Sequence, residues 1–240
     1  MDETMMRQVA FIGDQYVQGK IRGVALAFHG LGMVNEKRFP DTTELEWARV
    51  GWLVVYPYYG PWNWMNREAR AFVDELVDFV YAHFQLDDRL PLVSTGGSMG
   101  GLSALLYTRY AKRPISACLA LYPVCDFKYH FSERPDLPRS IYASLRGYQD
   151  DLESLFAEHS PLVQVHAMPD IPYLFIHGDA DQAVNKAAHS DQMVQAMQKR
   201  GLNVEYVQVS GMGHGSCVPI FVLQKMIAFL CEWPETIDIG

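Results

Sequence analysis

The chain has 240 residues and a formal net charge of −8, with 49% hydrophobic and 20% charged residues. This balance is typical of one globular domain and argues against a disordered chain. The acidic charge, without a basic stripe, argues against nucleic-acid binding, and no run reaches the roughly 20 apolar residues of a membrane helix. Because Met1–Gln8 is polar and lacks an apolar signal segment, we expect a cytoplasmic protein.

The cysteines give no sign of a metal or redox site. None of them forms a C-x-x-C pair or has a zinc-like spacing to histidine. Cys118 and Cys125 lie in or beside an apolar run, so buried free thiols are expected. We therefore expect no metal and no cofactor.

Short apolar runs alternate with helix-like segments along the chain. Continuous apolar runs suit strands that are buried on both faces, as in a parallel sheet, whereas apolar residues three and four apart predict helices. In chain order, the expected elements are strand Gly23–Phe28, strand Trp52–Tyr56, helix Asn66–Phe84, strand Leu90–Ser94, a helix from Ser98 that ends before Pro114, strand Cys118–Tyr122, strand Tyr173–Ile176, helix Asn185–Lys199, strand Val204–Val209 and helix Val218–Leu230. This alternation predicts an α/β fold with a doubly wound, mostly parallel sheet. Val9–Ile12 and Tyr16–Val17 are expected to form an antiparallel hairpin at one edge.

One region breaks the alternation. The segment 126–170 has no convincing strand, is rich in proline and charge, and contains one expected helix, at about Asp150–Glu158. A long stretch of this kind inside a compact α/β domain is often a lid over the active site. We expect one domain, 1–240, with a small cap at about 126–170.

The strongest chemical signal is Gly96–Gly101, which fits G-x-S-x-G between a predicted strand and a predicted helix. This pattern is typical of a nucleophile elbow, a tight and strained turn between strand and helix that exposes the serine hydroxyl. Gly96 and Gly100 then lie where strand and helix nearly touch, and a side chain there would clash. The pattern makes Ser98 the candidate nucleophile; the alternative is a glycine-rich turn that binds phosphate.

The sequence His29-Gly30-Leu31-Gly32 follows the first apolar strand, where a second donor to an oxyanion is expected. The resulting oxyanion hole would combine the N–H of Met99 with one N–H from this loop, that of Leu31 or otherwise that of Gly32. Each donor is worth about 3–4 kcal/mol of barrier. Taken alone, this short sequence is also typical of an ordinary strand-end turn.

The two remaining members of a catalytic triad are expected after the last two strands. Asp181 follows the strand that ends near Ile176, and we prefer it to Asp179, which suits a role in rigidifying the turn. His214 lies between glycines after the final strand. The other histidines have structural interpretations; His177 is expected in a hydrogen-bonded turn and His189 on a helix surface.

The order Ser98, Asp181, His214 is the chain order of α/β-hydrolases. In the mechanism that this order implies, His214 removes the Ser98 proton and Ser98 attacks an ester-like carbonyl. An acyl-enzyme forms, and water activated by His214 releases the acid. Asp181 holds the imidazole in its tautomer.

On these residues the sequence resembles the α/β-hydrolase superfamily, near the prolyl-oligopeptidase-type catalytic domains and dienelactone-hydrolase-like esterases. The resemblance spans most of the chain and also includes Ser160-Pro161, His177-Gly178 and Val184. It implies the triad Ser98, Asp181 and His214, with Met99 and Leu31 as amide donors. Because no propeller pattern precedes the hydrolase pattern, and serine stands where dienelactone hydrolases have cysteine, an esterase is expected.

Aromatic residues after the second strand are the substrate clue. They occupy the same edge of the sheet as the elbow, so Tyr58, Tyr59 and Trp62 are expected to line the substrate pocket, the alternative being core or dimer packing. The cap aromatics Tyr129, Phe131, Tyr142 and Tyr148 are further candidates. The expected substrate is a small or medium ester. A short peptide, cleaved by a peptidase or amidase with the same triad, and a non-catalytic binding protein are the alternatives; a homodimer is left open.

Overall fold

The computed structural model describes residues 1–33 and 39–231 and contains a seven-stranded sheet in the order β1-β3-β2-β4-β5-β6-β7. Strands β2 to β7 are parallel to their neighbours, and β1 is antiparallel to β3. The strands are β1 Ala10–Ile12, β2 Gly23–Phe28, β3 Trp52–Pro57, β4 Leu92–Gly97, β5 Ala117–Leu121, β6 Tyr173–Gly178 and β7 Val204–Val209. The predicted α/β class with a mostly parallel sheet is confirmed.

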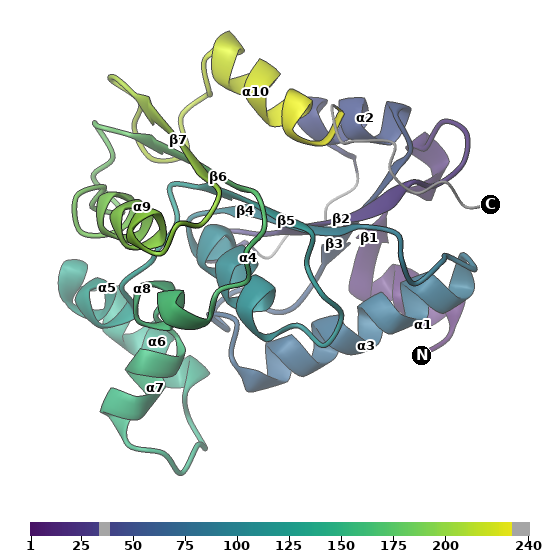
Figure 1. Cartoon of the computed structure of the whole chain (residues 1–240). Coiled ribbons are helices and arrows are strands. Elements are labelled where there is room, and N and C mark those ends of the chain that lie inside the picture. The colour runs from purple at the N-terminus through teal and green to yellow at the C-terminus, as the bar shows by residue number, and fades with distance from the viewer. Residues whose placement is uncertain (34–38, 232–240) are drawn as a thin grey trace.

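Helices cover both faces of the sheet (Figure 1). Alternate side chains of β2 enter two different cores: Val24 and Leu26 contribute to the larger one, and Ala25 to the smaller one. The larger core lies under α3 Arg67–His83, α4 Met99–Tyr110 and α9 Ser190–Lys199, and the smaller under α2 Thr42–Arg49 and α10 Ile220–Cys231. Burial on both faces explains why β2, β3, β5 and β6 read as continuous apolar runs, whereas most residues of the edge strand β7 are half-buried or exposed.

The edge of the sheet differs from the expected hairpin. β1 pairs with β3, for example Phe11 with Tyr56, and residues 14–16 form a short 3-10 turn rather than a return strand. The chain before β1 forms the helix α1 Glu3–Val9. The backbone of β1 forms its hydrogen bonds with the edge of β3, so β1 has a strand partner without a second hairpin strand.

Helix α2 was not predicted, although its start carries a recognisable signal. Asp41 accepts a hydrogen bond from the Glu44 N–H (3.0 Å), and Glu44 accepts one from the Asp41 N–H (2.8 Å). This reciprocal pair is a capping box, which a D-x-x-E pattern indicates. The helix is only eight residues long, so its apolar periodicity is weak.

The segment between β5 and β6 is more helical than expected. It contains α5 Phe127–Glu133, α6 Leu137–Ser144, α7 Leu152–Glu158, α8 Pro161–Gln164 and a 3-10 turn at Val165–Ala167. The expected helix corresponds to α7, and the other helices of this segment were not predicted. Phe127, Leu137 and Ile141 are fully buried in the larger core, so this helical insertion shares its core with the sheet.

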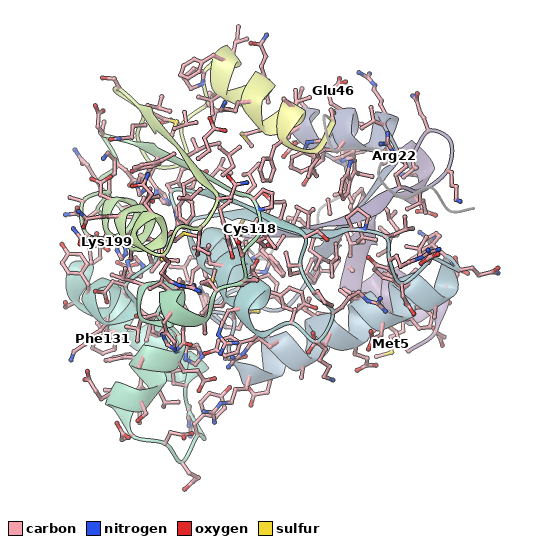
Figure 2. All side chains as sticks on the ribbon, in the orientation of Figure 1. Met5, Arg22, Glu46, Cys118, Phe131 and Lys199 are labelled. Atoms are coloured by element: carbon pink, nitrogen blue, oxygen red, sulfur yellow. The ribbon has the colours of Figure 1, made fainter. Side chains whose placement is uncertain are left out.

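Side chains fill the space on both sides of the sheet, and Cys118 lies among them on a central strand (Figure 2). As expected, Cys118 and Cys125 are buried free thiols. Burial raises the pKa of Cys118 to about 11, so this thiol stays protonated. Within the described ranges, no helix has the length and apolar character to cross a membrane.

Candidate active site

Ser98 occupies a tight turn between β4 and α4, with φ 60° and ψ −123°. A Cβ added to Gly96 would lie 2.4 Å from the Gly100 carbonyl oxygen, and one added to Gly100 would lie 2.2 Å from that of Phe28. Both positions therefore require glycine. The Ser98 N–H donates to the Leu121 carbonyl (3.0 Å), and its side chain does not cap α4, so the hydroxyl is available for other partners.

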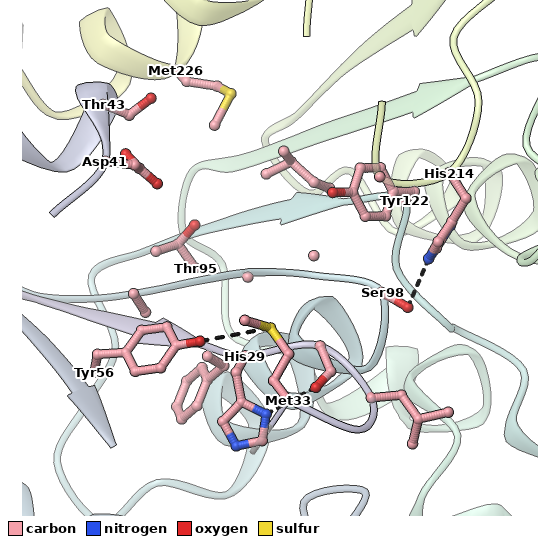
Figure 3. A pocket seen from close by; sticks show the side chains of 18 of the residues that line it. His29, Met33, Asp41, Thr43, Tyr56, Thr95, Ser98, Tyr122, His214 and Met226 are labelled. Atoms are coloured by element: carbon pink, nitrogen blue, oxygen red, sulfur yellow. Dashed lines mark hydrogen bonds between the residues drawn. The ribbon is translucent and has the colours of Figure 1, made fainter. Parts of the chain in front are cut away.

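His214, in the loop after β7, lies between the serine and a carboxylate. Its Nε2 is 3.0 Å from the Ser98 Oγ (Figure 3). Its Nδ1 is 2.7 Å from an oxygen of Asp181. An ionised carboxylate only accepts hydrogen bonds, so Nδ1 carries the hydrogen and Nε2 accepts from the serine hydroxyl. This is the tautomer that can remove the serine proton.

The Asp181 carboxylate is 1% exposed and has four hydrogen-bonded partners. One oxygen accepts from the N–H groups of Ala183 (2.8 Å) and Val184 (3.0 Å), and the other contacts two histidines. Burial alone would raise the pKa of Asp181, but hydrogen bonds from His177, His214 and the two backbone groups outweigh it and hold the pKa far below its usual value. The carboxylate is therefore ionised at neutral pH. Asp179, by contrast, is exposed and accepts from the Gly211 N–H (2.6 Å).

His177 is the second histidine on that carboxylate. Its Nε2 lies 3.2 Å from both the Asp181 oxygen and the Val184 carbonyl, and its Nδ1 lies 2.7 Å from the Ser190 hydroxyl. Since both neighbours of Nε2 are acceptors, Nε2 carries the hydrogen. The sequence indicated only a hydrogen-bonded turn here, and nothing in it pointed to the contact with Asp181.

The three candidate oxyanion donors differ in availability. The Gly32 N–H donates to the Pro61 carbonyl (2.8 Å), so this alternative donor is already engaged. The N–H of Met99, at the first position of α4, and that of Leu31 have no acceptor within residues 1–33 and 39–231. Leu31 lines the same cavity as Ser98, which leaves Met99 and Leu31 as the pair to test.

A cavity of about 540 Å³ opens beside Ser98 and His214. This volume is within the range of small-molecule sites. Its walls combine aromatic and polar side chains, which include Tyr56, Trp64, Thr95, Tyr122, His130 and Arg134.

None of the three predicted pocket residues, Tyr58, Tyr59 and Trp62, lines this cavity. Tyr59 is buried, with its hydroxyl 3.0 Å from both the His29 carbonyl oxygen and the Ser103 hydroxyl, so it braces the core. Tyr58 borders a separate hollow near Gln8. Trp62 is 54% exposed and does not line the cavity, although its indole nitrogen lies near Gly32. The chain turns after β3, and this turn brings Trp64 rather than its predecessors to the cavity.

The cap aromatics do not line the cavity either. Tyr129 and Tyr142 are exposed, Phe131 packs on Phe156, and the Tyr148 hydroxyl donates to Glu68 (2.9 Å). The residues of this segment at the cavity are instead His130 and Arg134, from α5 and its C-cap.

His130, Glu133 and His189 form a buried cluster whose polar atoms lie close enough to suggest a metal site. However, the His189 Nδ1 accepts from the N–H groups of Cys125 and Asp126, both at 3.1 Å. Its Nε2 must then carry a hydrogen, which it donates to Glu133 (3.1 Å), so this nitrogen is not free to bind a metal. The cluster is explained as a hydrogen-bond network, and His189, expected on a helix surface, is fully buried.

Solved structures of similar fold are mostly peptidases. A puromycin-hydrolyzing peptidase of Mycobacterium tuberculosis has a TM-score of 0.72 at 18% identity, over 89% of this chain and 34% of that one. An acylaminoacyl peptidase of Pyrococcus horikoshii has a TM-score of 0.72 at 14% identity, over 89% and 36%. The chain thus spans about a third of the length of these two peptidases.

A truncated carbohydrate esterase from gut microbiota is similar over nearly its whole length. Its TM-score is 0.69 at 18% identity, and the match covers 90% of this chain and 87% of that one. No curated protein matches the chain in sequence.

The sequence model of the prolyl oligopeptidase family, peptidase S9, matches residues 63–236. The match covers most of the chain, including Ser98, Asp181 and His214, and it agrees with the resemblance that the motifs indicated. The chain belongs to the prolyl oligopeptidase family.

Proposed function

We propose that the protein is a carboxylesterase that cleaves small or medium acyl esters, with Ser98 as nucleophile, His214 as general base and Asp181 as the acid that orients the histidine. The observation that carries the proposal is the continuous hydrogen-bond chain from the Ser98 Oγ through both imidazole nitrogens to the buried carboxylate. This chain gives the serine a base within reach and gives the base a charged partner.

The reaction proceeds in two halves. His214 Nε2 takes the Ser98 proton while Oγ attacks the ester carbonyl, and the resulting imidazolium is stabilised by Asp181. The N–H groups of Met99 and Leu31 bind the developing oxyanion. His214 then gives its proton to the leaving alcohol, so an acyl-Ser98 remains. A water deprotonated by His214 attacks this acyl group, and the acid leaves as Ser98 regains its proton.

Two observations favour an ester over a peptide. The cavity volume of about 540 Å³ suits a small molecule. In addition, one of the similar solved structures is named a carbohydrate esterase.

A peptidase or amidase is the second candidate, and the family match together with the two similar peptidases favours it. The triad is the same, and the difference lies in the leaving group. An amine must be protonated as it departs, so amide cleavage depends more strongly on the exact placement of His214 than ester cleavage does.

We further propose that the chain is one domain in which the segment 126–170 acts as a small cap. The cap contributes His130 and Arg134 to the cavity wall. Because its buried residues belong to the larger core, we propose a fixed wall rather than a hinged lid.

The experiment compares a p-nitrophenyl ester and a p-nitroanilide that share one acyl group. We expect the wild type to cleave the ester and to leave the anilide nearly untouched, and comparable rates on both would favour the peptidase. A fluorophosphonate probe is expected to label the wild type but not Ser98→Ala. Ser132→Ala, which removes an exposed hydroxyl on α5, is the matched control and should retain full activity. Turnover or labelling of Ser98→Ala would overturn the assignment, and an unlabelled wild type would point to a non-catalytic protein.

A further inference from the structure

Tyr122, the first residue after β5, has a backbone conformation that side chains rarely adopt. Its φ is 35°, and Pro123 follows it. Its N–H donates to the Ile176 carbonyl (2.6 Å), and the preceding Leu121 carbonyl accepts from the Ser98 N–H (3.0 Å). The strained residue is therefore fixed by hydrogen bonds to both neighbouring segments. Such over-determined strain is concentrated at functional sites.

The strained backbone conformation places the Tyr122 ring between Gly97 and His214. On one side, a Cβ added to Gly97 would lie 2.9 Å from the ring carbon Cε2 and 3.1 Å from the hydroxyl oxygen. Gly97 directly precedes the nucleophile. On the other side, the ring lies against His214, with centroids 4.7 Å apart and planes at 58°. The phenol thus touches the strand of the serine and the imidazole at the same time.

The Tyr122 hydroxyl points into the cavity, which this residue lines (Figure 3). In the part of the chain that the structure describes, this hydroxyl has no hydrogen-bond partner. Its oxygen is also not fully buried. Burial, reinforced by the charge of Asp181, raises the pKa of Tyr122. The phenol is therefore a neutral donor with a free hydrogen, directed toward the space that substrate occupies.

We infer that Tyr122 is a specificity-determining residue whose hydroxyl donates a hydrogen bond to an oxygen on the alcohol part of the bound ester. The alcohol part is favoured because His214, on which the ring rests, delivers the proton to the leaving alcohol. Substrates whose alcohol carries a further oxygen, such as polyol esters, are then preferred to esters of simple alkanols. The inference rests on the proposed esterase function.

The test compares ethyl butyrate with glyceryl monobutyrate, which share an acyl group and so form the same acyl-enzyme. Tyr122→Phe keeps the ring and removes the hydroxyl. We expect kcat/KM to fall about 5–10-fold on the glyceryl ester, as for one lost hydrogen bond, and to change by less than about 2-fold on the ethyl ester. The rate of fluorophosphonate labelling should stay near the wild-type value, since it reports the triad alone.

Three results would overturn the inference. These are no loss on either ester, an equal loss on both, or a parallel loss of labelling, which would mean that Tyr122 acts through His214. If the wild type is unlabelled and cleaves neither ester, the proposed function fails together with the inference.

A second measurement needs no variant and covers the case in which Tyr122→Phe does not fold. The wild-type acyl-enzyme is allowed to partition between water and added glycerol or 1-propanol, and the transesterified products are measured. We expect glycerol to be the better acceptor. Equal transfer to both alcohols would contradict a hydrogen bond on the alcohol side.

Discussion

Two regions border the same cavity and are held in place in different ways. The loops after β2, β4, β6 and β7 carry His29–Gly32, Ser98, Asp181 and His214, and their positions follow from backbone geometry at the ends of parallel strands. The helical insertion α5–α8 is held by side chains that reach distant segments. The positions of the reacting groups thus depend on local backbone geometry, whereas the far wall of the cavity depends on tertiary contacts.

The contacts of the insertion are specific. Arg67, at the start of α3, pairs with Asp150 (2.8 Å) and with Glu158, and Arg70 also pairs with Glu158. The Trp64 ring packs on His130, with centroids 5.4 Å apart. If the two regions differ in this way, substitutions at the strand ends should lower activity or disturb the packing of the Ser98 turn. Substitutions in the insertion should lower the stability of the fold.

The largest effect is expected at the buried acid. Asp181→Asn should keep the bonds from Ala183 and Val184 but favour the wrong tautomer of His214, so kcat should fall by about 10⁴-fold. Steady-state kinetics with a p-nitrophenyl ester measures this. Asp179→Asn, in the same loop but exposed, is the control and should change kcat by less than about 2-fold. A large loss in the control would reverse the choice of acid.

Next is the close packing under the elbow. In Gly100→Ala the new Cβ would meet the carbonyl oxygens of Phe28 and His29, at 2.2 and 2.8 Å, and backbone atoms do not yield easily. We expect a loss of about 3 kcal/mol in the free energy of unfolding, measured by urea denaturation. Gly30→Ala, where the nearest atom is 3.9 Å away, should lose less than about 1 kcal/mol. Equal stability of the two variants would show that the elbow is not closely constrained.

A smaller effect is expected from the second histidine on Asp181. His177→Asn removes the Nε2–H donor, and kcat should fall about 10- to 100-fold with little change in KM, in line with a hydrogen bond to a charged group. Ser190→Ala is the control because it removes the partner of Nδ1 and leaves the donor to Asp181 in place. If Ser190→Ala lowers kcat as much as His177→Asn does, the contact with Asp181 is not the cause.

The smallest effect concerns the insertion. Burial would raise the pKa of Glu158, but its bonds to Arg67 and Arg70 outweigh this and lower the pKa from 4.5 to about 2. The stabilisation is complete above the unfolded pKa and is lost as pH falls toward 2. Glu158→Gln should cost about 1 kcal/mol at neutral pH because the pair is partly exposed, with kcat unchanged.

Thermal unfolding between pH 7 and pH 2 tests this pH dependence. The difference between wild type and Glu158→Gln should shrink as the solution is acidified below about pH 4.5. Glu153→Gln is the control, since its pair with Lys128 is exposed on both sides and should contribute less than about 0.5 kcal/mol. A loss of activity in Glu158→Gln would instead link the insertion to the chemistry.

The parts that sequence reasoning identified are those with short-range causes. The glycines around Ser98 are required by contacts within a few residues or with the adjacent strand, and each candidate triad residue follows a different strand. Helices α5 and α6 escaped prediction because each is short and takes its stability from distant partners such as Trp64. The sequence favoured Asp181 over Asp179, and the structure separates the two carboxylates by burial and by the contact of Asp181 with His214.

The sequence by itself was sufficient to predict the parallel sheet, from apolar runs that alternate with helix-like segments, and the position of the candidate nucleophile, from the glycine pattern. Both features follow from local backbone geometry and burial. Tertiary structure decided which aromatic residues reach the cavity, that His177 meets Asp181, and that the Tyr122 ring lies between Gly97 and His214. These contacts join segments far apart in the chain. Their distances depend on how helices and loops pack together, a property that local sequence patterns do not contain.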